Sequence, residues 1–367
     1  MEKEYKKLFN TEQQNKFMQR TKAGTLRIEA KTLKVYEKRR QGWTTSNNNF
    51  QNAIKIIKLF KDHNNFQFLI DKKDPRFLKG QLSPDKKPQG ARINILQNGK
   101  KLDKAFSLFA EDLTIHDESS NSHWDVIYKN PSGAYSYVYT LEKRAKFKNK
   151  KYSIEKEFER YEPKLRENVS AALKDKEDPF ALPMYTLLKT YMRVGGEHYY
   201  ITHKHKGLST LKKKDVMINK KQVTFKYTAK DGVPLELSAE FPEEYISRLK
   251  NTLKKLKPDS FIFTNPSTGH PITDMHLKKA FKNYCGKEFY PHIVRSYYAT
   301  KTTKDFLKKH KKATKEEITA LFAGIAEKLG HRKYSKKENL WKDNPTMTMN
   351  FYIQPELVEK IKSITKN

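Results

Sequence analysis

The pattern of apolar residues changes near Arg144, and that change limits the possible folds more than any other feature of the chain. Between about Phe66 and Tyr139, short alternating runs such as FQFLI and WDVIY are separated by turn sequences such as DPRF, SPDKKPQG and NPSG, a pattern typical of short β-strands. Beyond Arg144, apolar residues recur mainly at helical spacing. We therefore expect an α+β fold, in which a small β-rich N-terminal domain precedes a largely α-helical domain that carries a β-hairpin.

The same patterns predict where the domains begin and end. Residues 1–65 are expected to form a basic N-terminal extension, polar and lysine-rich up to about residue 49, with a short amphipathic helix between Phe50 and His63. Residues 66–145 are expected to form the β-rich domain and residues 146–367 the helical domain. The lysine-rich segment AKFKNKK after Arg144 is interpreted as a basic linker between them.

The chain is strongly basic, with 75 Lys plus Arg against 42 Asp plus Glu and a formal net charge of +33. Such a charge destabilises the compact state by self-repulsion unless a polyanion neutralises it, so the expected partner is nucleic acid. A membrane partner is not expected, because no apolar run approaches the roughly 20 residues of a spanning helix and no apolar signal region is present. We therefore expect an intracellular, DNA-associated protein. The one cysteine, Cys285, excludes an intramolecular disulfide and a cysteine-based zinc cluster.

Local patterns in the helical region place polar residues at the ends of elements. The segment PFALPMYTLLKTYM predicts a helix from Phe180 towards Met192 that the following glycine pair stops, so that Arg193 emerges at a helix end. The segment VTFKYTAKDGVPLEL predicts a β-hairpin whose turn lies near Lys230. A capping-box signature followed by an apolar stripe predicts another helix, which ends directly before His331.

A set of sequence words resembles the active site of type IB DNA topoisomerases and occurs in the same order. These words are RVGGEHY at 193–199, GLSTL at 207–211, FKYTAKDGV at 225–233, HIVRSYYAT at 292–300, LGH at 329–331 and NFYIQPELVE at 350–359. The resemblance covers roughly residues 124–360 and includes NPSGAYSYVY, similar to the Gly-x-x-x-Tyr-x-Tyr hairpin with which the family contacts DNA. It implies that Tyr137 and Tyr139 lie at the DNA surface, although half-buried packing explains their alternation about as well.

The resemblance implies a topoisomerase IB/tyrosine recombinase catalytic domain and a set of catalytic residues, namely Arg193, Lys230, Arg295, His331 and Tyr352. Attack by the tyrosine on a phosphodiester would form a 3′-phosphotyrosyl link and conserve the bond energy for resealing. The guanidinium groups would hold the non-bridging phosphate oxygens, and the histidine would donate a hydrogen bond to them. The lysine would act as general acid for the departing 5′ oxygen. No metal, ATP or other cofactor is expected.

Two positions compete with this assignment. The interval from His331 to Tyr352 is 352 − 331 = 21 residues, longer than in poxvirus-like enzymes and recombinases. Its insert KYSKKENLWKDNP is interpreted as a solvated loop, and it contains Tyr334, the competing nucleophile. His292 forms an HxxR pair with Arg295 and is the second choice to His331.

The expected function is that of a type IB DNA topoisomerase. As a monomer, it would clamp double-stranded DNA and relax supercoils by transient cleavage and religation of one strand. The alternative is a tyrosine recombinase or integrase, which uses the same residues within a synaptic tetramer. The words RSYYAT and NPSGAYSYVY favour the topoisomerase, since the first resembles its RTWHAT-like word and the second has no counterpart in recombinases. A non-enzymatic DNA-packaging protein would explain the charge but not the ordered residues.

Overall fold

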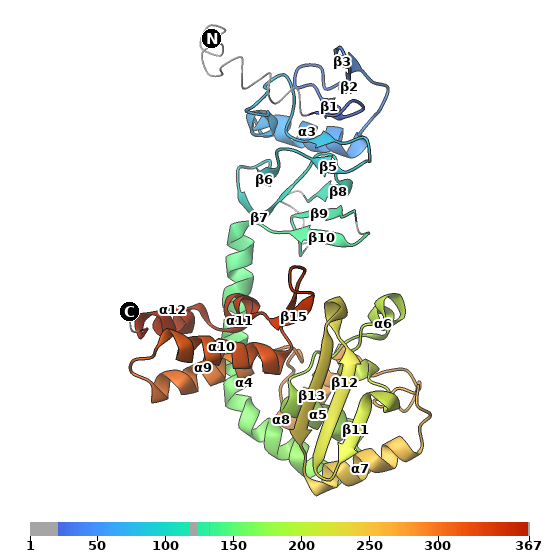
Figure 1. The fold of residues 1–367 in the computed structure, drawn as a ribbon, viewed down its shortest axis with the longest axis vertical. Helices are drawn as coiled ribbons and strands as arrows, with labels where there is room; N and C mark the ends of the chain where they lie inside the picture. Colours follow the sequence, from blue (N-terminus) through green and yellow to red (C-terminus); the bar gives the residue numbers. More distant parts are fainter. Residues whose placement is uncertain (1–20, 117–122, 132, 366–367) are drawn as a thin grey trace. The chain divides into compact units, whose positions relative to one another are not determined.

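The computed structural model describes residues 21–116, 123–131 and 133–365, and the chain divides into two compact units, Met1–Lys150 and Lys151–Asn367 (Figure 1). Each unit combines helices with antiparallel strands, which confirms the expected α+β class. Within the described ranges, no helix is both long enough and apolar enough to cross a membrane.

The N-terminal unit consists of short antiparallel strands around helix α3 (Gln51–Asp62). Its sheets have the strand orders β3-β2-β1-β4-β5, β10-β9-β8 and β6-β7. The strands are β1 (Leu26–Ile28), β2 (Val35–Arg39), β3 (Gly42–Thr45), β4 (Gln81–Leu82), β5 (Pro88–Gln89), β6 (Ile93–Ile95), β7 (Lys101–Phe106), β8 (Glu111–Ile115), β9 (Val126–Lys129) and β10 (Tyr135–Val138), and one 3-10 helix spans Phe66–Leu69.

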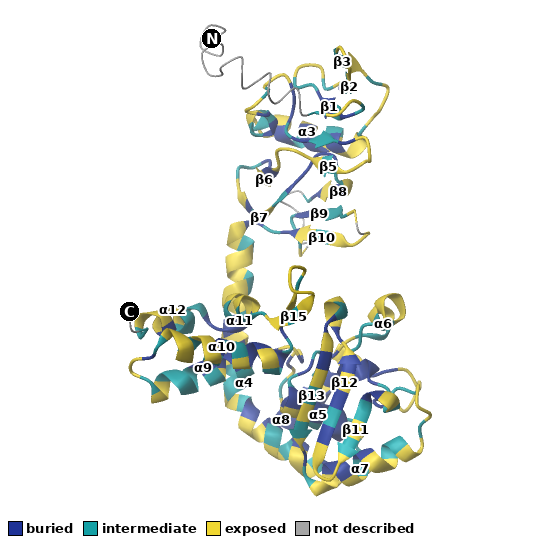
Figure 2. Ribbon diagram, in the orientation of Figure 1, coloured by how far each residue is buried: buried dark blue, intermediate teal, exposed yellow. Residues whose placement is uncertain are grey.

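One hydrophobic cluster extends from Ile28 on β1 to Val138 on β10, and α3 adds Ile57 and Phe60 to it (Figure 2). Helix α3 confirms the amphipathic helix expected after residue 50. Strands β1–β3 were not expected, because they bury few apolar side chains, none of them on β3, and the surrounding sequence is polar. The first 20 residues of the expected extension lie outside the described residues, and the division at residue 65 stays a prediction.

Helix α4 (Leu141–Ala172) runs without a break through AKFKNKK, and the division between the two units falls within this segment, so the expected linker is helical. Lysine and alanine are good helix formers, and a basic run therefore does not by itself end a helix. Beyond residue 150 the helix buries Tyr152, Glu155, Phe158 and Leu165 in the C-terminal unit.

In the C-terminal unit a three-stranded sheet of order β11-β12-β13 lies with α5 and α7, and helices α9–α12 form a second group (Figure 1). The helices are α5 (Ala181–Thr190), α6 (Glu197–His203), α7 (Glu243–Lys254), α8 (Asp274–Cys285), α9 (Ile293–Lys309), α10 (Lys315–Leu329), α11 (Pro345–Tyr352) and α12 (Pro355–Ser363). The strands are β11 (Val216–Asn219), β12 (Gln222–Thr228), β13 (Pro234–Glu240), β14 (Arg332–Ser335) and β15 (Leu340–Asp343), and 3-10 turns span Leu208–Thr210, Lys213–Asp215 and Lys230–Gly232.

Two hydrophobic clusters meet along α9. Val294 belongs to the larger cluster, which includes the sheet, α5, α7 and α8, whereas Ala299 belongs to the cluster of α9–α12. Arg295 lies next to Val294 on this shared helix and is only 2% exposed. The fold therefore places a buried arginine where the two cores join.

The β-hairpin expected around Lys230 and the capping box of α10 are both confirmed. Helix α5 ends earlier than expected, because Tyr191 adopts a left-handed conformation with φ 57° before the glycine pair is reached. The insert after His331 is largely exposed, as expected, but it forms a β-hairpin, so its interpretation as a loop was wrong. Tyr334 and Trp341 face each other across its strands, and such aromatic pairs stabilise a hairpin.

Candidate active site

Tyr352 is the last residue of α11, and its side chain is buried, with 4% exposed. Its hydroxyl accepts a hydrogen bond from Nη2 of Arg193 at 3.0 Å and lies 3.1 Å from Nε2 of His292. The ring of His331 lies 4.3 Å from the tyrosine ring, measured between centroids, and the guanidinium of Arg295 lies 5.5 Å from it. The structure therefore brings Tyr352 together with both predicted arginines and both candidate histidines.

Both histidines are neutral at physiological pH. Burial, reinforced by the guanidiniums of Arg295 and Arg193, lowers the pKa of His331 to about 2. His292 is exposed as a residue, although its Nε2 lies against the hydroxyl of Tyr352. Desolvation, followed by the charges of the same two arginines, lowers its pKa to about 3. A neutral imidazole nitrogen therefore lies against the phenol oxygen of Tyr352.

Both ring nitrogens of His331 are engaged. Nη2 of Arg295, 3.1 Å from Nε2 of His331, can only donate, so Nε2 accepts. Nδ1 then carries the proton and donates to Oγ1 of Thr348 on α11 at 2.9 Å. In this arrangement His331 orients Arg295 and α11, whereas His292 contacts the phenol. The expected donation from His331 to phosphate stays a prediction.

Arg295 is fixed by backbone carbonyls. Its Nη1 donates to the carbonyl oxygen of Tyr191, and its Nη2 donates to that of Leu329 at 2.7 Å. Burial lowers the pKa of Arg295 to about 10, which leaves it protonated at neutral pH. Its buried Nε has no hydrogen-bond partner in the described structure. A buried donor of this kind is rare in native proteins and requires an explanation.

Arg193 is positioned by the turn that contains GLSTL. The backbone N–H of Leu208 donates to the carbonyl oxygen of Arg193 at 2.8 Å, and that of Ser209 donates to the carbonyl oxygen of Val194 at 2.8 Å. Gly207 lies so close to the segment of Arg193 and Val194 that a Cβ atom would be 2.5 Å from the carbonyl oxygen of Arg193. Glycine is therefore the one residue that allows the two segments to approach this closely.

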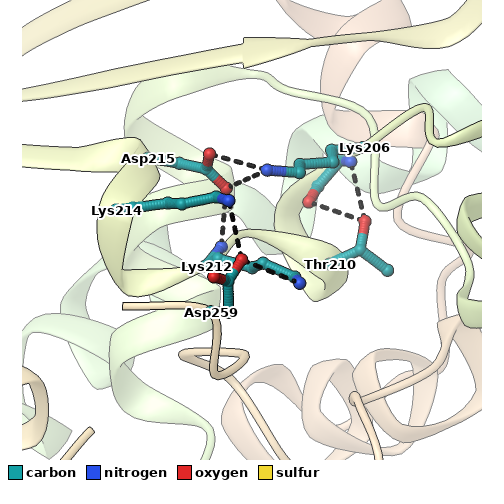
Figure 3. Close-up of polar contacts among 7 residues, drawn as sticks. Lys206, Thr210, Lys212, Lys214, Asp215 and Asp259 are labelled. Atoms are coloured by element: carbon teal, nitrogen blue, oxygen red, sulfur yellow. Dashed lines mark hydrogen bonds and ion pairs between the residues drawn. The ribbon is translucent and has the colours of Figure 1, made fainter. Parts of the chain in front are cut away.

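Ion pairs hold the same turn in place (Figure 3). The ammonium of Lys206 contacts both carboxylate oxygens of Asp215, at 2.6 and 2.7 Å, and this pair is largely buried. Lys212 and Lys214 pair with Asp259 at 3.3 and 2.6 Å. Lys206 is therefore neutralised within the fold, although it lies beside the candidate site.

A cavity of about 420 Å³ lies beside these residues and is lined by Arg193, Lys230, His292 and Arg295. A narrower space of about 70 Å³ is lined by four of the predicted residues, namely Arg193, Lys230, Arg295 and His331. Lys230 is exposed at the tip of the β12–β13 hairpin, and no contact between its ammonium and Tyr352 is present among the described residues. Among those residues, no group of three or more His, Cys, Asp or Glu side chains is arranged to hold a metal ion.

Helix α4 supplies contacts that sequence patterns did not indicate. The ammonium of Lys151 lies 5.3 Å from the ring centroid of Tyr352 and donates to the carbonyl oxygen of Phe351. The hydroxyl of Tyr152 donates to the carbonyl oxygen of Ile353 at 2.7 Å. Their partners are 200 and 201 residues away, so no local motif could have revealed them. His292 did have a signal, the HxxR spacing.

Tyr137 and Tyr139 belong to the N-terminal unit. Tyr137 lies on β10 and is 44% exposed, on the same face as Tyr135. Tyr139 packs edge-on against Phe147, and burial raises the pKa of its phenol. Tyr137 is therefore open to a ligand, Tyr139 only in part, and their role in DNA binding stays a prediction.

Comparisons with known proteins are consistent with this geometry. The sequence family described as the catalytic core of eukaryotic DNA topoisomerase I matches residues 142–359. No curated protein matches the sequence.

Solved structures of recombinases resemble the chain more distantly. The XerA recombinase aligns with a TM-score of 0.34 and 15% identity, over 55% of this chain and 61% of that one. The XerH site-specific recombinase, bound to difH substrate in a pre-cleavage complex, aligns with a TM-score of 0.32 and 19% identity, over 54% of this chain and 52% of that one. This chain thus spans between half and two thirds of the recombinases that it matches. Because the family match at residues 142–359 covers more than half of the sequence, the chain belongs to the eukaryotic DNA topoisomerase I catalytic-core family.

Proposed function

We propose that this protein is a type IB DNA topoisomerase that relaxes supercoiled duplex DNA through a 3′-phosphotyrosyl intermediate on Tyr352. One observation carries the proposal. The buried hydroxyl of Tyr352 lies between a donor on Arg193 and a neutral nitrogen of His292, and both of these residues line the cavity that Arg295 and Lys230 also line.

Activation of the nucleophile follows from these two contacts. A phenol with an ordinary pKa of about 10 is a poor nucleophile at neutral pH, so its proton needs an acceptor. His292 is unprotonated at neutral pH, and the charges of Arg295 and Arg193 contribute to its lowered pKa. A bound phosphate that offsets these charges would make Nε2 a stronger base, which can take the proton as the tyrosine attacks. The hydrogen bond from Arg193 strengthens as negative charge develops on the phenol oxygen.

Stabilisation of the transition state falls to the arginines. A phosphodiester in the cavity would meet the guanidiniums of Arg193 and Arg295, whose N–H groups suit its non-bridging oxygens. The unsatisfied Nε of Arg295 is explained if it gains an acceptor, directly or after a small shift, when DNA is bound. His331 holds this arginine from behind through Nε2.

Lys230 is the proposed general acid for the departing 5′ oxygen. It lies at a hairpin tip without an ion pair among the described residues, so its long side chain is free to move towards a bound phosphate. Its ammonium would donate a proton during cleavage, and the resulting amine would accept one during religation. The chemistry uses side chains alone, because the phosphotyrosyl bond conserves the energy needed for resealing.

A monomer with this site would clamp duplex DNA with help from the N-terminal unit, where the exposed Tyr137 is a proposed contact. A tyrosine recombinase remains the rival, since it performs the same bond exchange within a tetramer. The family match favours the topoisomerase.

The test is relaxation of a supercoiled plasmid in EDTA without ATP. We expect both positive and negative supercoils to be removed, because a nicked strand that rotates freely responds only to the direction of the torque. The Tyr352→Phe variant is the control and should leave the plasmid supercoiled. Strict dependence on magnesium or ATP would refute the proposal, and recombined products from two plasmids would favour the rival.

A further inference from the structure

The hairpin β14–β15 connects the two halves of the candidate site. Arg332 directly follows His331, and at the other end the backbone N–H of Asn344 donates to the carbonyl oxygen of His331 at 2.6 Å. The side chain of Asn344 also caps α11, accepting from the N–H of Met347 at 3.2 Å. The base of the hairpin is therefore joined both to His331 and to the helix that ends at Tyr352.

The two faces of this hairpin differ. One face carries Tyr334 opposite Trp341, with ring centroids 5.4 Å apart, and Trp341 packs against the larger hydrophobic cluster. Arg332 lies on the same face and donates to the carbonyl oxygen of Pro234 at 3.1 Å, which ties the hairpin to β13. The aromatic face is thus held by the protein, so that the opposite face, which carries Lys333, points away from it.

The outer face concentrates positive charge. Lys333 lies directly opposite Lys342, and like charges in such a pair destabilise a hairpin. Glu338 neutralises Lys342 at 2.6 Å. Lys333 and the turn residues Lys336 and Lys337 are exposed and have no ion pair among the residues that the structure describes. The hairpin therefore carries uncompensated charge beside a site that is itself cationic, an arrangement that an anionic ligand would stabilise.

We propose that the β14–β15 hairpin binds the phosphate backbone of the same DNA duplex whose scissile phosphate occupies the cavity. The identity of that duplex rests on the proposed function. Lys333 of the outer face and the turn residues Lys336 and Lys337 supply the contacts, and they carry no sequence information because they meet phosphates rather than base edges. Since the hairpin is joined to His331 and to α11, DNA held there also holds the nucleophile and Arg295 in register with the cavity.

The salt dependence of binding tests this contact without any cleavage. In a Tyr352→Phe background, the substitutions Lys333→Gln, Lys336→Gln and Lys337→Gln remove the proposed contacts. Each phosphate contact contributes about 0.9 to the slope of log affinity against log salt, so the triple variant should have a slope shallower by up to about 2.7. The matched control carries glutamine at Lys254, Lys255 and Lys257, which are exposed at the end of α7. Its slope should change by less than about 1.

An equal change of slope in the two triple variants, or an unchanged slope in the hairpin variant, would overturn the proposal. Because this measurement involves no chemistry, it is independent of the relaxation assay. If the slope changes as expected but the enzyme relaxes no DNA, the hairpin contact stands and the proposed function fails.

Photocrosslinking provides a second test. The one native cysteine, Cys285, is 2% exposed, so a cysteine introduced in Lys336→Cys can be labelled selectively with an aryl azide. This probe should crosslink to a short duplex, whereas the same probe at Lys255→Cys should crosslink much less. Equal crosslinking from both positions would contradict a specific role for the hairpin.

Discussion

Replacement of Gly207 by alanine tests whether the GLSTL turn positions Arg193. A Cβ atom at residue 207 would lie 2.5 Å from the carbonyl oxygen of Arg193, 2.6 Å from the backbone nitrogen of Gly195 and 2.7 Å from the carbonyl oxygen of Val194. All three contacts are with backbone, which cannot move aside as a flexible side chain can. The segment that carries Arg193 must therefore separate from the turn.

This separation breaks the two backbone hydrogen bonds at 2.8 Å that join the segments, from Leu208 to Arg193 and from Ser209 to Val194. At about 1 kcal/mol net for each bond, the free energy of unfolding should fall by about 2 kcal/mol. Displacement of the guanidinium from the hydroxyl of Tyr352 should also slow cleavage by roughly 10²–10³, the usual effect of losing one transition-state donor.

The matched control is Gly196→Ala. Gly196 belongs to the same loop and also has an extended backbone, at φ −160°, but no atom lies within 4 Å of the position of its Cβ. Urea denaturation and single-turnover cleavage of a short duplex measure the two effects. Near-wild-type cleavage by Gly207→Ala, or equal damage in both variants, would refute the proposed positioning of Arg193.

Three further predictions concern the charged residues. Arg193→Ala should slow cleavage with little change in stability. Arg295→Ala should slow cleavage and also lower the stability, since Arg295 donates to two backbone carbonyls; equal stability of the two variants in urea would contradict this. The pKa of His331 is lowered to about 2 in the folded state, so the unfolded state binds a proton first as pH falls below about 6.5. The free energy of unfolding should therefore decrease below that pH, by up to roughly 1.4 kcal/mol per pH unit. Denaturation of the wild type and of His331→Gln at pH 7.5 and 5.5 should show a smaller loss in the variant, and an equal loss would refute the assignment. Cleavage by Lys230→Ala should be rescued by sulfur at the 5′ bridging position, because a thiolate leaves without protonation, whereas Arg295→Ala should not be rescued; rescue of both or of neither would remove Lys230 as the acid.

Local patterns predicted the parts of the fold that local interactions determine. The capping box at Thr314 marks the start of α10, and the alternation on either side of Lys230 marks the β12–β13 hairpin. The ordered words also identified the arginines, the histidine and the tyrosine that the structure brings together around Tyr352. These features depend on spacing along the chain, which a sequence displays directly.

The features of the fold and the site that sequence patterns did not predict depend on contacts between residues far apart in the chain. Strands β1–β3 were not recognised because their formation depends on pairing with a neighbouring strand, which the sequence does not display. The insert after His331 was interpreted as a loop because the pairing of Tyr334 with Trp341 follows only from the strand register, which the sequence does not give. The contact between His292 and Tyr352 joins residues 60 positions apart, so local patterns could not place this histidine against the phenol.

Identification of the residue that becomes covalently attached to DNA tests the central claim most directly. A duplex with a short 3′ flank, from which the cleaved strand is lost, would trap the intermediate for proteolysis and mass spectrometry. We predict one adduct, a phosphotyrosyl bond between Tyr352 and the 3′ end of the cleaved strand, which is absent from the Tyr352→Phe variant. An adduct on Tyr334, attachment to a 5′ end, or a persistent adduct in Tyr352→Phe would contradict the proposed site.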